Sequence, residues 1–380
     1  MMKRYLMAPG PTPIPVEALL AMSKPILHHR AAEYEQIFSE VRQGLKFLFQ
    51  TSTEVLVFAS SGTGAMEGAV VNTLSPGDKV LVVRGGKFGE RWGEICQAYG
   101  VNFEAIDVEW GNPADPALIE AALKRDPSIK AVFVTHSETS TGTLSDLKTI
   151  AEVVSRTPAL LIADVVTSLG VTDVPVDAWK IDVAAAGSQK GLMLPPGLAF
   201  CSVSDKAWEM VAKSKLPKFY FNFTAEKQNI EKNQNAWTPA VSLLMALRET
   251  LALIQQEGLA NVFARHGRLA RATRAGVTAL GLELYSKAPT PAVTAVKAPA
   301  GIDGGQIVKT LRTKHGITIA GGQSHLKGKI FRISHMGYVD TYDIVTAISA
   351  LEMTLAGLGY PVELGKGVRA AEAVLMEGKA

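Results

Sequence analysis

Short apolar runs alternate with helix-like segments along much of this 380-residue chain, and this alternation constrains the fold more than any other feature. The apolar runs cover residues 55–58, 79–83, 131–134, 159–163, 181–187 and 197–203. The helix-like segments between the first four of them cover residues 64–74, 88–99, 116–125 and 146–155. Strands that are apolar on both faces need cover on both faces, so the pattern predicts an α/β fold with a mostly parallel sheet covered by helices.

The rest of the chain predicts an arm and a second, smaller domain. Four prolines in residues 9–15 exclude a helix there and favour an extended N-terminal arm. From about residue 258, long helices bracket short strands, which is typical of an α+β domain. We therefore predict a large domain at 16–255 and a small C-terminal domain at 256–380, with the arm at 1–15.

Composition excludes several classes of function. The formal net charge of +3 gives no electrostatic footprint for nucleic acid. Two cysteines, Cys96 and Cys201, do not make a disulfide framework, so we expect a reducing cytoplasm. No apolar run is long enough to span a membrane, and the first residues do not resemble a signal peptide. The adjacent His28 and His29 have no carboxylate or cysteine cluster around them, so we expect no metal site.

Two charged residues follow buried strands at the predicted site. Asp164 ends the apolar run 159–163, and Lys190 follows the run 181–187 in the motif Gly187-Ser188-Gln189-Lys190-Gly191. The carboxyl ends of parallel strands meet at one edge of a sheet, where ligands bind. Pyridoxal phosphate needs an amine for its aldehyde and a carboxylate for its ring nitrogen. Asp164 and Lys190 therefore suit this cofactor, although a helix cap or a salt bridge would also explain the aspartate.

Four further motifs fit the same interpretation but are weak on their own. The small-residue turn at Ser61, Gly62 and Thr63 could hold a phosphate or merely cap a helix. Phe88 could stack on a ring or lie in the core. The polar run 135–142 includes His136, which could be a base or a buried structural histidine, and Thr139, which could bond a ring hydroxyl. Arg332 could clamp a carboxylate or face water on an edge strand.

The order of these motifs resembles that of the class V pyridoxal-phosphate aminotransferases, most of all the serine–pyruvate / alanine–glyoxylate group. The resemblance runs from Pro9-Gly10-Pro11-Thr12 to the last long helix. Its most specific pieces are 187–191, Pro195-Pro196-Gly197 and Thr139-Ser140-Thr141-Gly142. It implies the aspartate-aminotransferase-like fold of type I pyridoxal-phosphate enzymes and an obligate homodimer with shared active sites.

The resemblance also implies a role for each matching residue. Lys190 would hold the cofactor through a Schiff base, Asp164 would pair with the ring nitrogen, and Arg332 would bind the substrate carboxylate. The remaining cofactor-binding residues would be Ser61, Gly62, Thr63, Phe88, Thr139, Val166 and Gln189, with Thr238 reaching the cofactor phosphate of the neighbouring subunit. Some members carry a tyrosine three residues before or just before that threonine, where this chain has Asn235 and Trp237.

The resemblance therefore implies a transaminase that moves an amino group from alanine or serine to glyoxylate or pyruvate. One alternative is the same reaction on 2-aminoethylphosphonate or ureidoglycine, and another is a non-catalytic partner subunit that binds the cofactor. A cysteine desulfurase needs a cysteine in the C-terminal domain, and none follows Cys201. A nucleotide-binding protein needs a dinucleotide fingerprint or a phosphate-loop lysine, and neither is present.

Overall fold

A seven-stranded sheet forms the centre of the molecule, and a computed structural model describes residues 2–377. The strands lie in the order β2 (Val55–Ser60), β10 (Gly197–Val203), β9 (Val183–Gly187), β8 (Leu160–Asp164), β5 (Ala131–Thr135), β3 (Lys79–Arg84) and β4 (Asn102–Asp107). Neighbouring strands pair in parallel, except that β10 is antiparallel to both β2 and β9. The predicted mostly parallel sheet is therefore confirmed, with one strand reversed.

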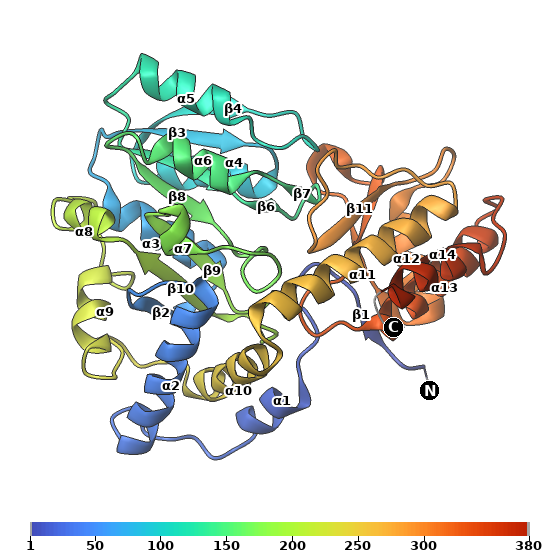
Figure 1. The fold of residues 1–380 in the computed structure, drawn as a ribbon, viewed down its shortest axis with the longest axis horizontal. Helices are drawn as coiled ribbons and strands as arrows, with labels where there is room; N and C mark the ends of the chain where they lie inside the picture. The colour runs from blue at the N-terminus through green and yellow to red at the C-terminus, as the bar shows by residue number, and fades with distance from the viewer. Residues whose placement is uncertain (1, 378–380) are drawn as a thin grey trace.

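Helices connect and cover these strands (Figure 1). They are α3 (Gly62–Thr73), α4 (Lys87–Ala98), α5 (Pro116–Arg125), α6 (Leu147–Val154), α7 (Val176–Trp179), α8 (Asp205–Val211) and α9 (Phe223–Ile230). Four of them begin where a capping side chain accepts from a free N–H group: Asp115 before α5, Asp146 before α6, Ser204 before α8 and Asn222 before α9. Helix α3 packs on β9 and β10, while α4 packs on β3 and β4.

Three helices pack together beside the β2 edge of the sheet, at the lower end of Figure 1. They are α1 (Val16–Met22), α2 (Ala32–Phe49) and α10 (Val241–Glu257). The buried face of α2 runs from Tyr34 to Phe49 at helical spacing. Helix α1 begins directly after Pro15, where the proline-rich arm ends.

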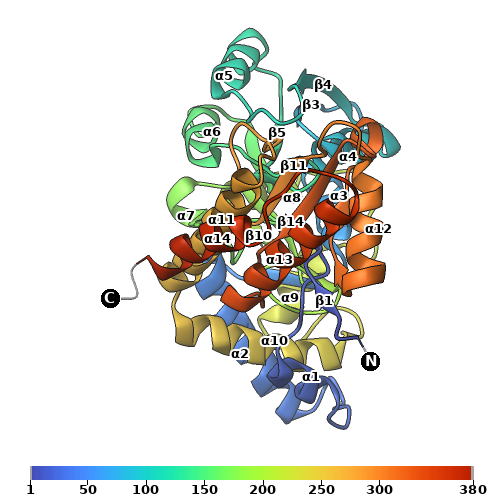
Figure 2. The same cartoon turned by 90° about the vertical axis from the view of Figure 1, so that its right-hand side faces the viewer.

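The C-terminal part has its own antiparallel sheet and helices, which face the viewer in Figure 2. The sheet order is β11 (Val293–Lys297), β14 (Ile330–Ser334) and β13 (Ala320–Gly321). The helices are α11 (Leu259–Ala279), α12 (Gly304–His315), the short η1 (Ser324–Leu326), α13 (Thr341–Gly357) and α14 (Lys366–Met376). This part is α+β. A separate hairpin of β6 (Ser137–Glu138) and β7 (Thr143–Leu144) lies between β5 and β8 in the chain.

The N-terminal arm crosses from one part of the molecule to the other. Its strand β1 (Tyr5–Leu6) pairs in parallel with β12 (Ile317–Thr318), more than 300 residues away in the chain. A few residues later, the hydroxyl of Thr12 donates to the backbone carbonyl of Lys190 at 3.0 Å. The arm therefore links the C-terminal part to the loop that follows β9.

The buried apolar side chains form two main cores. The first runs from Ala18 to Val262, and the second combines Met7 with residues from Leu269 to Leu375. Both cores include side chains of α11, so the packing changes from one core to the other along this helix. The division at residue 255 stays a prediction, and residues 378–380 of the predicted small domain lie outside the described range. Within residues 2–377, the helices are too short or too polar for any of them to cross a membrane.

Candidate active site

Asp164 and Lys190 lie at the same edge of the large sheet. Asp164 is the last residue of β8, and the adjacent parallel strand β9 ends three residues before Lys190. The Asp164 carboxylate is buried and accepts one hydrogen bond, from the backbone N–H of Val166 at 2.9 Å. The Lys190 amine is also buried and donates to the backbone carbonyl of Pro9 in the arm.

Burial makes the ionised form of both groups costly. It raises the pKa of Asp164 to about 7, with the Val166 N–H opposing the change. It lowers the pKa of Lys190 to about 8, and the positive charge of Arg332 lowers it further. A ligand that brings a cation to Asp164 and an electrophilic carbonyl to Lys190 would relieve both costs.

A small-residue turn lies beside them at the start of α3. Ser61 is the N-cap residue, but its side chain makes no capping hydrogen bond, so first-turn N–H groups remain available to an anion. A Cβ added to Gly62 would lie 2.6 Å from Cγ2 of Val166, so this position has room for glycine alone. The side-chain oxygen of Gln189 is buried without a hydrogen-bond partner. These features suit a small, polar, anionic group.

One cavity of about 270 Å³ brings most of the predicted residues together. Eight of them line it: Ser61, Gly62, Thr63, Phe88, Asp164, Val166, Gln189 and Lys190. Phe88 is half-buried and faces this cavity, so the alternative of a core phenylalanine is wrong. The cavity is also lined by six residues for which the sequence predicted no role in binding: Gly10, Pro11, Met66, Arg91, Thr167 and Pro196.

Three predicted residues do not line the cavity. Arg332 is buried on β14, the central strand of the small sheet, so the alternative of a solvent-facing arginine on an edge strand is wrong. It donates to the carbonyls of Thr139 and Gly321, and burial lowers its pKa to about 10. The Thr139 hydroxyl shares a 2.6 Å hydrogen bond with that of Thr167. Thr238 is exposed on a separate loop after α9.

Glu138 is a buried carboxylate that sequence reasoning missed. One of its oxygens accepts from the backbone N–H groups of Phe88 and Gly89, each at 3.0 Å, and the other accepts from the N–H and hydroxyl of Ser140. It therefore fixes the start of α4, and with it the position of Phe88. Burial raises the pKa of Glu138, while these donors oppose the change. An acid within a polar run directly after a buried strand was the available signal.

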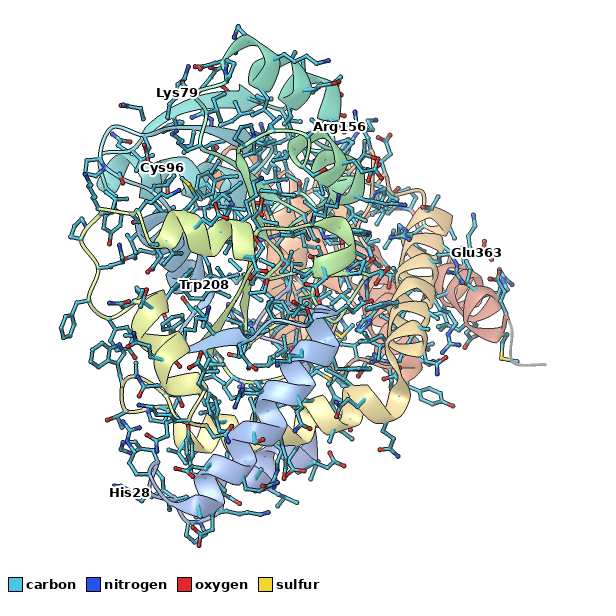
Figure 3. All side chains as sticks on the ribbon, turned by 60° about the vertical axis from the view of Figure 1, so that its left-hand side comes forward. His28, Lys79, Cys96, Arg156, Trp208 and Glu363 are labelled. Atoms are coloured by element: carbon cyan, nitrogen blue, oxygen red, sulfur yellow. The ribbon has the colours of Figure 1, made fainter. Side chains whose placement is uncertain are left out.

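The histidines and cysteines do not form a second centre. His136 is buried beside Trp179, and burial lowers its pKa to about 4. His28 lies at the surface, well apart from Cys96 (Figure 3). Burial raises the pKa of Cys96 to about 12 and also raises that of Cys201, so neither thiol is a ready nucleophile. Residues 2–377 contain no cluster of three or more His, Cys, Asp or Glu side chains with the geometry of a metal site.

Comparison with known proteins settles the family. The family model described as Aminotransferase class-V matches residues 4–345. This chain belongs to the class V aminotransferases. The class V enzyme is 49% identical, over 98% of both chains, to a Synechococcus protein named "Soluble hydrogenase, small subunit". It is 38% identical to the serine–glyoxylate aminotransferase of Methylorubrum extorquens, covering 99% of this chain and 96% of that one.

A solved structure is similar to the class V enzyme along almost its whole length. The ureidoglycine–glyoxylate aminotransferase of Bacillus subtilis has a TM-score of 0.94 and 33% identity, covering 99% of this chain and 98% of that chain. The class V aminotransferase fold is therefore confirmed, and the enzyme is an aminotransferase that uses pyridoxal phosphate. The cavity fits this cofactor, because it combines a buried amine, an underpaired carboxylate, an unpartnered Gln189 oxygen and an anion-binding turn.

Proposed function

We propose that this class V aminotransferase moves the amino group of a small L-amino acid, alanine or serine, to a 2-oxo acid, glyoxylate or pyruvate. The observation that carries the proposal is that Lys190 and Asp164, both buried and both costly when ionised, line one small cavity. The serine–glyoxylate relative supports the choice of donor and acceptor.

In this proposal, each residue has a defined task. Pyridoxal phosphate, when bound, supplies a carbonyl that takes up amines and a ring that withdraws electrons from the substrate α-carbon. Lys190 holds the cofactor between turnovers and carries a proton from the substrate α-carbon, for which a pKa of about 8 is well suited. Asp164 holds positive charge at the ring nitrogen. Val166 and Phe88 would enclose the ring, and Gln189 and Thr139 would bond its phosphate or hydroxyl.

We assign the binding of the substrate carboxylate to Arg332. Three of its five N–H groups already donate, to the carbonyls of Gly321 and Thr139. One N–H remains on each terminal nitrogen, which leaves a pair of donors for the two oxygens of a carboxylate. The existing bonds hold the guanidinium in one orientation, so little conformational entropy is lost when substrate binds.

We also assign Thr238 to the active site of a second copy. It is exposed, and it follows Trp237, whose ring stacks on that of Phe219 at 5.0 Å. Phe219 is 77% exposed, and Trp237 also stacks on the exposed Tyr220, so these rings form one aromatic patch of the kind that marks an interaction site. Asn235 instead points inward, where it contacts Tyr34 and Glu226, so its side chain is not free to reach a neighbour. This supports a homodimer in which Thr238 and the exposed aromatic residues contact the other subunit.

A second candidate function comes from the relative named as a hydrogenase subunit. In that case the chain would bind the cofactor but act as the partner of another protein. This chain has only two cysteines, both buried and without a neighbouring metal-donor cluster among residues 2–377, so a hydrogenase metal centre would have to be held by the partner. The free thiols support our proposal that the enzyme works in the cytoplasm.

The test is a two-stage absorbance experiment on the purified, cofactor-loaded enzyme. L-Alanine or L-serine alone should bleach the visible band of the cofactor bound to Lys190, and glyoxylate or pyruvate should restore it. Ureidoglycine and 2-aminoethylphosphonate serve as competing donors. A response to one of these alone would overturn the choice of donor, and a loaded enzyme that responds to no donor would favour the partner-subunit function.

A further inference from the structure

A ligand that carries a phosphate needs more positive charge in the cavity than Lys190 and the start of α3 supply. Among the residues that line it, Lys190 and Arg91 are the cations and Asp164 is the anion. Lys190 and Asp164 are taken by the aldehyde and ring ends of pyridoxal phosphate. The phosphate itself carries close to two negative charges and is buried when bound, and an unpaired buried charge is costly. The helix dipole of α3 supplies only about half a positive charge.

Arg91 lies beside the turn that would hold this phosphate. Its Nη1 donates to the hydroxyl of Thr63 at 3.0 Å, and its guanidinium lies 4.8 Å from the centre of the Phe88 ring. Phe88 and Arg91 are one helical turn apart on α4, so both side chains reach the same cavity. The guanidinium is thus held between the predicted ring-stacking residue and the predicted phosphate turn.

Arg91 differs from its neighbours in having no carboxylate partner within the described part of the chain. Lys87, one turn earlier, pairs with Glu90 at 3.2 Å and Glu94 at 2.9 Å. Arg84, just before α4, pairs with Asp107 at 2.7 Å. Arg91 uses one N–H for Thr63, so four of its five donors are not engaged by that bond. An unpaired arginine that faces a cavity is suited to bind an anion.

We propose that Arg91 is a ligand of the cofactor phosphate and supplies most of the positive charge that neutralises it. The alternative anion is the distal carboxylate of a dicarboxylic donor substrate. The phosphate is favoured because the bond to Thr63 places Arg91 at the phosphate turn, whereas Arg332 donates to Thr139 and Gly321 and does not line the cavity that contains this turn. The inference rests on the use of pyridoxal phosphate and is independent of which amino acid is the donor.

The test compares two ligands that differ only in the phosphate. Pyridoxal phosphate and pyridoxal are titrated into cofactor-free protein, and binding is followed by absorbance without any amino acid present. R91Q should weaken binding of pyridoxal phosphate by about 10- to 100-fold, the value of a charge-assisted hydrogen bond, and leave binding of pyridoxal within about twofold. R91K should retain part of the preference, because it keeps the charge but loses the planar fork.

R84Q is the matched control, because it removes a nearby arginine that is paired and lies outside this cavity; its preference for the phosphate should equal that of the unmodified protein. If R91Q fails to fold by circular dichroism, R91K decides the result. An unchanged preference for the phosphate in R91Q, or in R91K where R91Q does not fold, would overturn the proposal. The proposal would also be overturned by an Arg91 variant that keeps this preference but whose affinity for a dicarboxylic donor falls, relative to the unmodified protein, more than its affinity for alanine. A failure of every amino acid donor would affect the proposed function and leave this result intact.

Discussion

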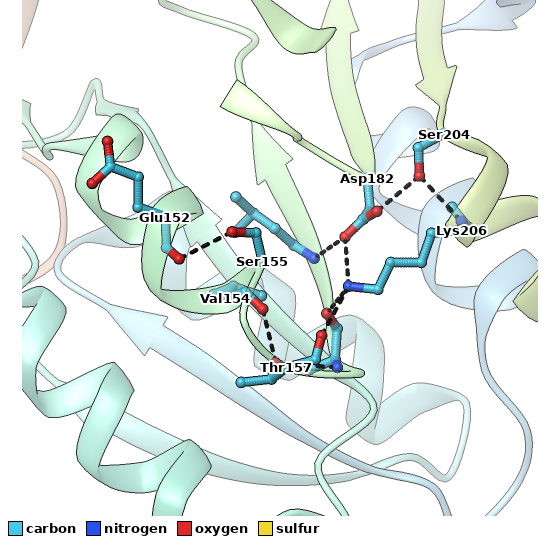
Figure 4. Close-up of polar contacts among 10 residues, drawn as sticks. Glu152, Val154, Ser155, Thr157, Asp182, Ser204 and Lys206 are labelled. Atoms are coloured by element: carbon cyan, nitrogen blue, oxygen red, sulfur yellow. Dashed lines mark hydrogen bonds and ion pairs between the residues drawn. The ribbon is translucent and has the colours of Figure 1, made fainter. Parts of the chain in front are cut away.

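Two buried aspartates lie at opposite ends of the adjacent strands β8 and β9. They differ in how many hydrogen bonds the protein makes to their carboxylates. Asp182 directly precedes β9, and its carboxylate accepts from the N–H of Leu161 at 2.9 Å and the hydroxyl of Ser204 at 2.8 Å. The Lys206 amine lies 3.4 Å away (Figure 4). Asp164 ends β8 with one backbone N–H as its hydrogen-bond partner.

The two lysines differ in the same way. Lys206 donates to the carbonyls of Thr157 and Ala159 as well as contacting Asp182, so it joins three segments at the amino ends of the strands. Lys190 is buried with one carbonyl partner, and its pKa falls to about 8. The Asp182–Lys206 group is satisfied by the protein alone, whereas Asp164 and Lys190 are incomplete without a ligand. The residues of the site therefore differ from those of the scaffold in that their charged groups have too few hydrogen-bond partners within the protein.

The largest effect should come from exchanging the two lysines for alanine. K190A should lower the turnover number by about a thousandfold or more, because it removes both the covalent anchor and the proton carrier. K206A should keep its turnover number within a few-fold but lose about 1–3 kcal/mol of unfolding free energy. Steady-state kinetics and urea unfolding of both variants test this. A K206A variant that loses activity while it remains folded would contradict the distinction between a catalytic Lys190 and a structural Lys206.

Replacing Asp182 should lower the free energy of unfolding, which is a smaller effect than the loss of turnover in K190A. D182N should destabilise the protein by about 2–4 kcal/mol at pH 7, because it leaves Lys206 without its carboxylate and places amide N–H groups against donors. Chemical unfolding measures the loss. D205N, a change of the same type at an exposed neighbour, is the control and should lie within about 0.5 kcal/mol of the unmodified protein. An equal loss for both variants would contradict the comparison.

In the cofactor-free protein, replacing Asp164 by asparagine should raise the free energy of unfolding, whereas replacing Asp182 lowers it. Its pKa is raised above the usual 3.8 to about 7, so its stability contribution is complete below pH 4 and is lost as the pH rises through 7. Asparagine stays neutral, so D164N should be more stable than the unmodified protein by up to about 4 kcal/mol at pH 8 and equal to it near pH 4. Unfolding curves at the two pH values check this. A variant that is less stable at pH 8 would show that Asp164 is satisfied after all.

The smallest effect is expected for Glu138, which acts through the position of Phe88. E138Q keeps the shape but offers one acceptor oxygen in place of two, so the N–H groups of Phe88 and Gly89 or those of Ser140 lose their partner. Cofactor affinity should fall by about tenfold. The visible circular dichroism of the bound cofactor should also change, because the ring environment shifts. The change in affinity without the spectral change would assign Glu138 to stability alone.

The sequence predicted the elements that carry the site better than the contacts within it. Asp164 and Lys190 were predictable because strand ends of a parallel sheet share one edge, and the apolar runs mark those strands. Strand β4 was not predicted, since as an edge strand it is only half-buried and lacks an apolar run. The carbonyl of Pro9 beside Lys190 was not predictable either, because 181 residues separate them in the chain.

Arg332 and Glu138 show a second limit of the sequence. The residue type of Arg332 suggested anion binding, whereas Glu138 was missed. The orientation of both depends on backbone carbonyls and N–H groups of distant segments, such as Thr139 and Phe88. Backbone groups are the same in every residue, so no sequence pattern marks them. Arg91 is similar, because only the structure shows that it lacks a carboxylate partner among residues 2–377 while Lys87 has two.

The most direct test of the account is the thermal stability of the unmodified protein and D164N, each with and without pyridoxal phosphate, at pH 8. If Asp164 is destabilising alone and satisfied by the cofactor, D164N should melt at a higher temperature than the unmodified protein without cofactor. With saturating cofactor the order should reverse, because the unmodified protein gains the pairing with the ring nitrogen and D164N does not. If D164N melts lower in both conditions, Asp164 is a structural residue and the assignment of the site is wrong.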